Sequence, residues 1–120
     1  MLLGLLACSP APPRYQTRGV VRARTGTGAE TRYAIHHEPI PTFKGREGEP
    51  APMDSMMMMF GLADGVHVDE VAPGTKVSVS FDVVWSSGEA LRVTRMQPLP
   101  DATVLDLRAG AAHGKPPAAR

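Results

Sequence analysis

The segment from Lys76 to Trp85 limits the possible fold most strongly. One face of this segment is apolar, with Val77, Val79, Phe81, Val83 and Trp85. The other face has Lys76, Ser78, Ser80 and Asp82, and only Val84 departs from the alternation. Because side chains of a strand point alternately to its two faces, this alternation predicts a half-buried β-strand. Glycine and proline occur twelve times each, which favours short strands and tight turns over helices.

Four other segments have the composition of strands, residues 17–23, 32–37, 56–62 and 89–96. Turn residues stand before the strongest strand (72–75) and after it (86–88). Residues 44–52 are polar and rich in Gly, Pro and Glu, so we expect a mobile surface loop there. Trp85 is expected in the core. Five short strands with one long connection predict an all-β domain, a small closed or nearly closed β-barrel.

The two ends of the chain differ from this domain. Residues 1–8 form a short apolar run ending at Cys8, the only cysteine, and resemble a bacterial lipoprotein signal in which that cysteine is lipidated. The alternative is a frayed apolar terminus with a buried cysteine. Residues 9–14 are expected to be an extended tether and 15–98 the barrel. Residues 99–120 are a C-terminal extension, with a disordered tail from 109 onward.

The net charge of +1 gives no reason to expect binding to nucleic acid or to an anionic membrane. No nucleophile motif, phosphate-binding glycine loop or carboxylate pair is recognisable, so we expect that the protein is not an enzyme. Blue-copper electron transfer needs a thiolate ligand, which a chain lipidated at Cys8 would lack.

Imidazole and thioether groups are concentrated in two nearby segments. His36 and His37 precede Glu38, and four consecutive methionines run from Met56 to Met59. Soft sulfur ligands select Cu(I), or Ag(I), over hard cations. Outside the cytoplasm thiols tend to be oxidised, whereas thioethers and imidazole stay available. The two segments therefore predict a Cu(I)/Ag(I) site.

Strand phase decides which of these side chains face the core. His37 shares a face with Tyr33 and Ile35, the larger apolar pair of its strand, so it should point toward the core or its rim. Met56 and Met58 share a face with Phe60 in the same way. A shift of one residue would exchange these methionines with Met57 and Met59.

Each candidate also has a simpler explanation. Methionines at alternate strand positions are often core residues without metal. His36 should face solvent, although it remains an alternate ligand. Glu38 is either a partner that orients a neighbouring imidazole or an ordinary solvated carboxylate. His67 and His113 are expected at the surface.

The order of Gly19-Val20-Val21, Ile35 to Ile40, Met56 to Phe60 and Pro73 to Val77 resembles the CusF-type periplasmic copper- and silver-binding proteins, over roughly residues 17–97. The resemblance implies an OB-like five-stranded barrel with disordered termini that carries one Cu(I) or Ag(I) ion. The histidine ligand of the family falls on His37 and its methionine ligands on Met56 and Met58. Met53 stands where the best-known members have a tryptophan against the metal, so it is a further thioether ligand or a cap.

With the lipoprotein-like terminus, the resemblance implies a periplasmic or surface-tethered metallochaperone that hands copper to an export or resistance system. We expect a monomer, without nucleic acid, that reaches the membrane only through its lipid. Two alternatives remain: an OB-like binding module for nucleic acid or oligosaccharide, and a structural lipoprotein without metal.

Overall fold

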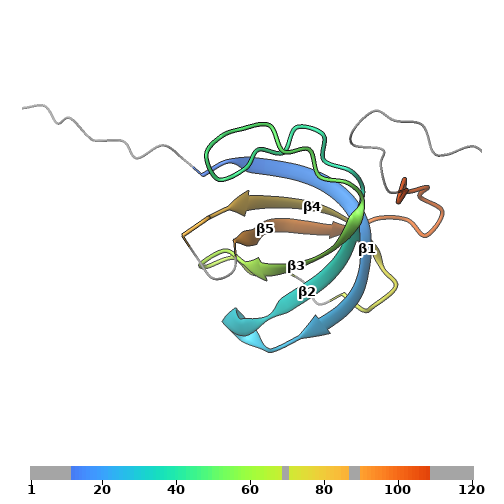
Figure 1. The fold of residues 1–120 in the computed structure, drawn as a ribbon. Helices are drawn as coiled ribbons and strands as arrows, with labels where there is room; N and C mark the ends of the chain where they lie inside the picture. Colours follow the sequence, from blue (N-terminus) through green and yellow to red (C-terminus); the bar gives the residue numbers. More distant parts are fainter. Residues whose placement is uncertain (1–11, 69–70, 87–89, 109–120) are drawn as a thin grey trace, which may run out of the picture.

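The computed structural model describes residues 12–68, 71–86 and 90–108. The elements in chain order are β1 (Arg14–Thr25), the 3-10 turn η1 (Gly28–Glu30), β2 (Arg32–His37), β3 (Met56–Leu62), β4 (Lys76–Val83) and β5 (Leu91–Pro98). The strands close into a barrel in the order β1-β2-β3-β5-β4 (Figure 1). Among the strands that the structure describes, only β3 and β5 pair in parallel, through Gly61↔Arg92 and Leu62↔Val93. The predicted all-β barrel of five strands is confirmed.

Several strand limits differ from the predicted ones. β1 is longer at both ends than 17–23 and includes Arg14, which the sequence assigned to the tether. Arg14 pairs with Asp82 of β4 in the ladder and donates from Nε to Asp82 Oδ1 at 2.7 Å. β4 ends at Val83 rather than Trp85, and β5 begins at Leu91 and continues to Pro98. The limits of β2 and β3 agree with the prediction.

The core lies inside the barrel and follows the predicted alternation. All four inward residues of β4 are buried, and Phe60, Phe81 and Val93 are fully inaccessible to solvent. Ring contacts link Phe60 to Phe81 at 5.2 Å between centroids. Trp85 is half-buried and packs edge-on against Phe43 at 6.2 Å.

The connection between β2 and β3 is a hydrogen-bonded hairpin. Residues 44–52, where we expected a surface loop, are mostly exposed within it, and their mobility stays a prediction. Ile40 and Met53 exchange both backbone hydrogen bonds, at 2.8 and 3.0 Å, and Lys44 pairs with Pro50. Phe43 of this hairpin is buried and packs against Tyr15, with 5.0 Å between the two ring centroids. The hairpin therefore folds over the barrel beside the start of β1 (Figure 1).

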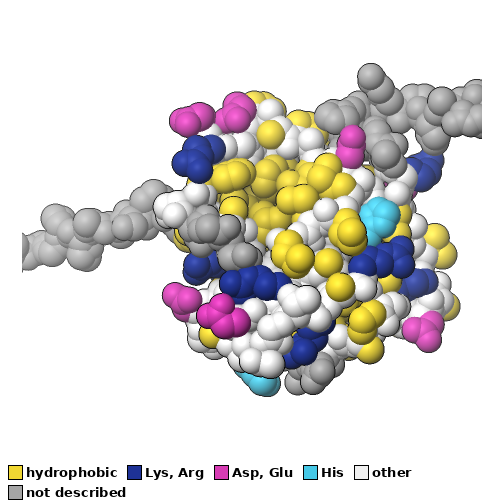
Figure 2. All heavy atoms as spheres, turned by 60° about the horizontal axis from the view of Figure 1, so that its bottom comes forward, with side chains coloured by type: hydrophobic (Ala, Val, Ile, Leu, Met, Phe, Trp, Pro, Cys, Tyr) yellow, Lys and Arg dark blue, Asp and Glu magenta, His cyan; other side chains and the backbone are white. Residues whose placement is uncertain are grey.

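Hydrophobic side chains also reach the surface of the barrel, as Figure 2 shows on the face turned forward, with Lys and Arg side chains around them. Among the described residues, the large hydrophobic side chains that are exposed are Met56, Met57, Met59 and Val104. Three of these four belong to the methionine run of β3. No helix in the described ranges is long and apolar enough to cross a membrane.

Gly19 is a point of close approach beside His37. It lies opposite His37 in the β1–β2 ladder. A Cβ on Gly19 would lie 2.5 Å from the His36 carbonyl oxygen and 2.9 Å from His37 Cα. Contacts that short force a backbone shift, so only glycine lets β1 and β2 approach as they do here.

We therefore expect Gly19→Ala to destabilise the protein by about 1–3 kcal/mol, the usual cost of overpacking. The shift should also move His37 and weaken Ag(I) binding, measured by competition titration of the refolded variant. Gly74→Ala is a useful contrast, because no atom lies within 4 Å of its added Cβ although its φ is +96°. It should destabilise the fold without changing the affinity, and equal loss of affinity in both variants would refute the explanation.

Candidate metal site

The ladder between β2 and β3 brings the predicted ligands together. His37 lies directly opposite Met56, and Ile35 lies opposite Met58. Residues directly opposite in an antiparallel pair have Cβ atoms about 4.5–5.5 Å apart, and diagonal neighbours on one face are about 7–8 Å apart. Met56 is therefore the direct neighbour of His37 and Met58 its diagonal neighbour, within reach of a flexible thioether side chain.

Burial agrees with the inward phase at His37 and Met58 but not at Met56, which is exposed. His37 is fully buried, as is Ile35. Met58 is half-buried and packs against the core, whereas Met56 is 38% exposed at the rim. Met57 and Met59, which belong to the opposite face, are 59% and 51% exposed.

The His37 ring is held at one nitrogen and open at the other. Nδ1 lies 2.6 Å from the backbone carbonyl oxygen of Glu38. A carbonyl only accepts, so Nδ1 must carry the proton, and this assigns the tautomer with a lone pair on Nε2. Nε2 is buried and has no hydrogen-bond partner among the described residues. The Phe60 ring packs edge-on against the imidazole, with 6.4 Å between the two ring centroids. A buried acceptor without a partner is costly, and a metal ion would satisfy it.

The environment of His37 also keeps the ring neutral. Burial lowers its pKa below 6.5, the nearby His36 lowers it further, and the hydrogen bond to Glu38 opposes these effects only in part. Only neutral imidazole can bind a metal ion. The lowered pKa therefore extends the range in which Nε2 is ready to coordinate.

This pKa gives a prediction for the metal-free protein. After unfolding, His37 returns to a pKa of about 6.5, so below that pH the unfolded chain binds a proton that the folded chain refuses. The free energy of unfolding should fall as pH drops from about 6.5 toward the lower folded-state pKa. Urea unfolding at about pH 7.5 and pH 5 measures this loss, which should be smaller in His37→Gln. An equal loss in both proteins would contradict it.

The two other candidate ligands named from the sequence are His36 and Met53. His36 is half-exposed and opposite Met57, on the outer face of β2. Met53 pairs with Ile40 in the same register as His37 and Met56, farther along the hairpin, and its half-buried side chain packs against the core. Cys8 lies outside the described residues. Within the described ranges, no three His, Cys, Asp or Glu side chains gather as a metal cluster.

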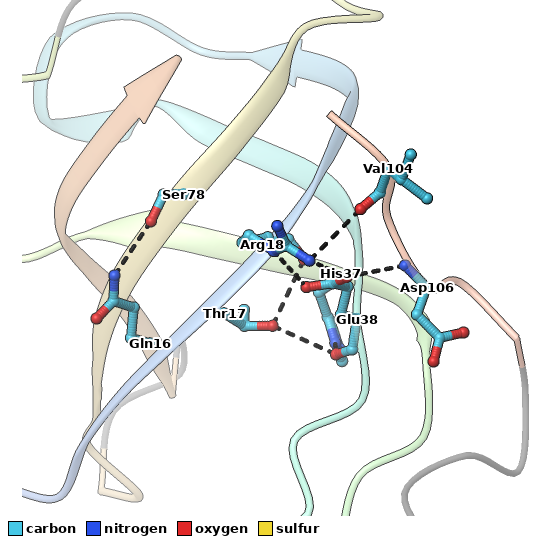
Figure 3. A network of polar contacts seen from close by, with 8 residues as sticks. All are labelled: Gln16, Thr17, Arg18, His37, Glu38, Ser78, Val104 and Asp106. Carbon is cyan, nitrogen blue, oxygen red and sulfur yellow. Dashed lines mark hydrogen bonds and ion pairs between the residues drawn. The ribbon is translucent and has the colours of Figure 1, made fainter. Parts of the chain in front are cut away.

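A polar network supports the turn after His37 (Figure 3). Arg18 donates from Nε and one Nη to the two carboxylate oxygens of Glu38, each at 2.8 Å. The Asp106 backbone N–H donates to Glu38 Oε2 at 2.8 Å, and the Thr17 hydroxyl donates to the Glu38 carbonyl at 3.3 Å. The group that orients the imidazole is therefore the Glu38 carbonyl, whereas the Glu38 carboxylate fixes the turn.

The sequence of this barrel matches a known protein family. The sequence profile of the family described as copper binding periplasmic protein CusF matches residues 14–98. The chain belongs to the CusF family. This match confirms the resemblance found in the sequence. The family is one of copper-binding periplasmic proteins. The comparison with curated protein sequences gave no match.

Solved CusF structures have the same fold. Apo-CusF residues 6–88 from Escherichia coli is 18% identical with a TM-score of 0.55, covering 82% of this chain and 100% of that one. The Ag(I) form of residues 10–88 is 21% identical with a TM-score of 0.53, covering 75% and 96%. A further Ag(I)CusF crystal structure is 18% identical with a TM-score of 0.51, covering 73% and 100%. At these identities the likeness establishes the OB-like CusF barrel.

Proposed function

We propose that this chain is a periplasmic carrier that binds one Cu(I) or Ag(I) ion through His37, Met56 and Met58 and hands it to an export or resistance system. The observation that carries the proposal is the buried Nε2 of His37, which lacks a partner among the described residues and lies on the face that Met56 and Met58 share. One imidazole and two thioethers suit a soft ion of low coordination number. The Ag(I) complexes of CusF support the same ion class.

The position of the site at the rim supports transfer. Met56 is 38% exposed, whereas His37 is fully buried. An incoming acceptor can replace the exposed thioether first, while the imidazole still holds the ion. We propose that the acceptor is a component of a copper or silver efflux system or another periplasmic copper protein, that Met53 caps the site, and that the carrier acts as a monomer.

We propose further that Cys8 is lipidated and tethers the carrier to the bacterial membrane. The support is the apolar run 1–8 and its small residue Ala7 before the cysteine. The test is the partition of the protein expressed with its own signal in a Gram-negative host. Cys8→Ser should move it from the membrane fraction to the soluble fraction, and an unchanged distribution would refute the tether.

The alternative of an OB-like nucleic-acid or oligosaccharide binder lacks a stacking surface. The chain has two Tyr, three Phe and one Trp. Tyr33 and the phenylalanines are buried, and Tyr15 and Trp85 are half-buried against the core. Single-stranded nucleic acids stack on exposed aromatic rings, which this barrel does not offer.

Metal selectivity tests the proposal. The chain with Cys8→Ser, which removes the only thiol, is mixed with one equivalent of Cu(I), Ag(I) or Zn(II) and examined by native mass spectrometry. We expect full occupancy with Cu(I) or Ag(I) and little retention of Zn(II), because thioethers are poor ligands for the harder ion. Equal retention of Zn(II), or the absence of an Ag(I) adduct, would overturn it.

A further inference from the structure

The outer face of the same two strands repeats the inner ligand set. His36 lies directly opposite Met57, and Ala34 lies opposite Met59. Met57 is therefore the direct neighbour of His36 across the ladder and Met59 its diagonal neighbour. This is the arrangement that His37 has with Met56 and Met58, displaced by one residue and turned to the other side of the sheet.

The two sets exist at the same time and are not alternative registers. Phe60 lies opposite Tyr33, and both are buried in the core. A shift of β3 by one residue would turn Phe60 out to solvent, at a cost of about 1.5–3 kcal/mol for the lost burial. This aromatic pair therefore fixes Met57 and Met59 on the outside, beside His36.

Core packing does not account for the outer methionines. Met57 and Met59 are 59% and 51% exposed, so more than half of each residue is in contact with solvent and neither belongs to the buried core. Outward positions of a barrel strand are ordinarily polar, as Ser78 and Ser80 are in β4. Two exposed thioethers beside a half-exposed imidazole have, in contrast, the chemistry of a soft-metal site.

The side of β3 that faces away from β2 is an edge between the inner and outer ligand sets. Its pairing with β5 involves only Gly61 and Leu62. From Met56 to Phe60 the side of β3 away from β2 has no strand partner within the described part of the chain. Along this edge Met57 is the chain neighbour of Met56, which is exposed at the rim.

We propose that His36, Met57 and Met59 form a second site for Cu(I) or Ag(I) on the outer face of the barrel. It binds more weakly than the inner site, because its ligands are exposed and less firmly held. It does not depend on the inner site, so the two can be tested separately. It gives the carrier a place where an ion is held while it enters or leaves.

Native mass spectrometry during titration with Ag(I) tests this site, with Cys8→Ser as the parent chain. The parent should take up two ions in succession. The variant Met57→Leu/Met59→Leu should take up only the first, and so should His36→Gln. The inner variant Met56→Leu/Met58→Leu should lose the tight ion and keep the weaker one. Leucine keeps the apolar volume, and circular dichroism confirms that each variant folds.

Adventitious binding to the other histidines needs a matched control. His67→Gln/His113→Gln should still bind two ions. If this variant loses the second ion, or if the parent binds only one, the outer site is refuted while the inner site stands. If the outer variants lose the tight ion and the inner variant keeps it, the inner assignment fails instead.

Discussion

His37→Ala, Met56→Leu and Met58→Leu should each weaken binding of the first Ag(I) ion by at least about 10–100-fold, the range already found when only a group supporting a ligand is lost. The leucine changes should cost less than about 1.5 kcal/mol of stability, because they conserve volume in the barrel. Met57→Leu and Met59→Leu should leave the affinity for the first ion unchanged. Competition titration with a chelator of known Ag(I) affinity measures each constant.

The contrary result is equally clear. If Met57 and Met59 prove necessary for the first ion while Met56 and Met58 do not, the inner site is not the tight one. His36→Ala is the matched control for His37→Ala, since the two residues are adjacent and face opposite sides of β2. It should change the second ion only.

Treatment of the metal-free protein with peroxide should abolish its later binding of Cu(I). Methionine sulfoxide is polar and a harder ligand than a thioether, so its formation at Met56 and Met58 removes the soft donors. One equivalent of Ag(I), added first, should protect these two sulfurs. Met57 and Met59 should oxidise at nearly the same rate with and without that equivalent.

Peptide-level mass spectrometry of sulfoxide after a short peroxide exposure provides the measurement. Each methionine is compared with itself in the two samples, because Met56 and Met58 differ in exposure even without metal. Protection confined to Met57 and Met59, or no protection of any methionine, would show that the first ion is bound elsewhere.

Local patterns predicted the strands that carry the proposed inner ligands. The limits of β2 and β3 agree with the structure, and alternation placed His37 inward with Ile35. Those inferences needed only near neighbours, since facing alternates along a strand. The start of β1 was missed because Tyr15 gains its burial from Phe43 and Phe81, far along the chain.

The support of the site could not be predicted in the same way. Glu38 was weighed as a partner of the imidazole, but its carboxylate binds Arg18 and the backbone of Asp106, which is 68 residues away. Pairings at such separations depend on how the barrel closes. The hairpin through Ile40 and Met53 was likewise hidden, because its polar Gly- and Pro-rich sequence is also typical of a loop.

The central claim is that the buried Nε2 of His37 binds the first ion while Nδ1 stays protonated against the Glu38 carbonyl. Histidine-ring ¹H–¹⁵N correlation spectra at neutral pH, before and after one equivalent of Ag(I), test it directly. We predict that the Nε2 resonance of His37 shifts, that its Nδ1 remains protonated, and that His36 is unchanged. A spectrum in which His36 responds and His37 does not would contradict the account.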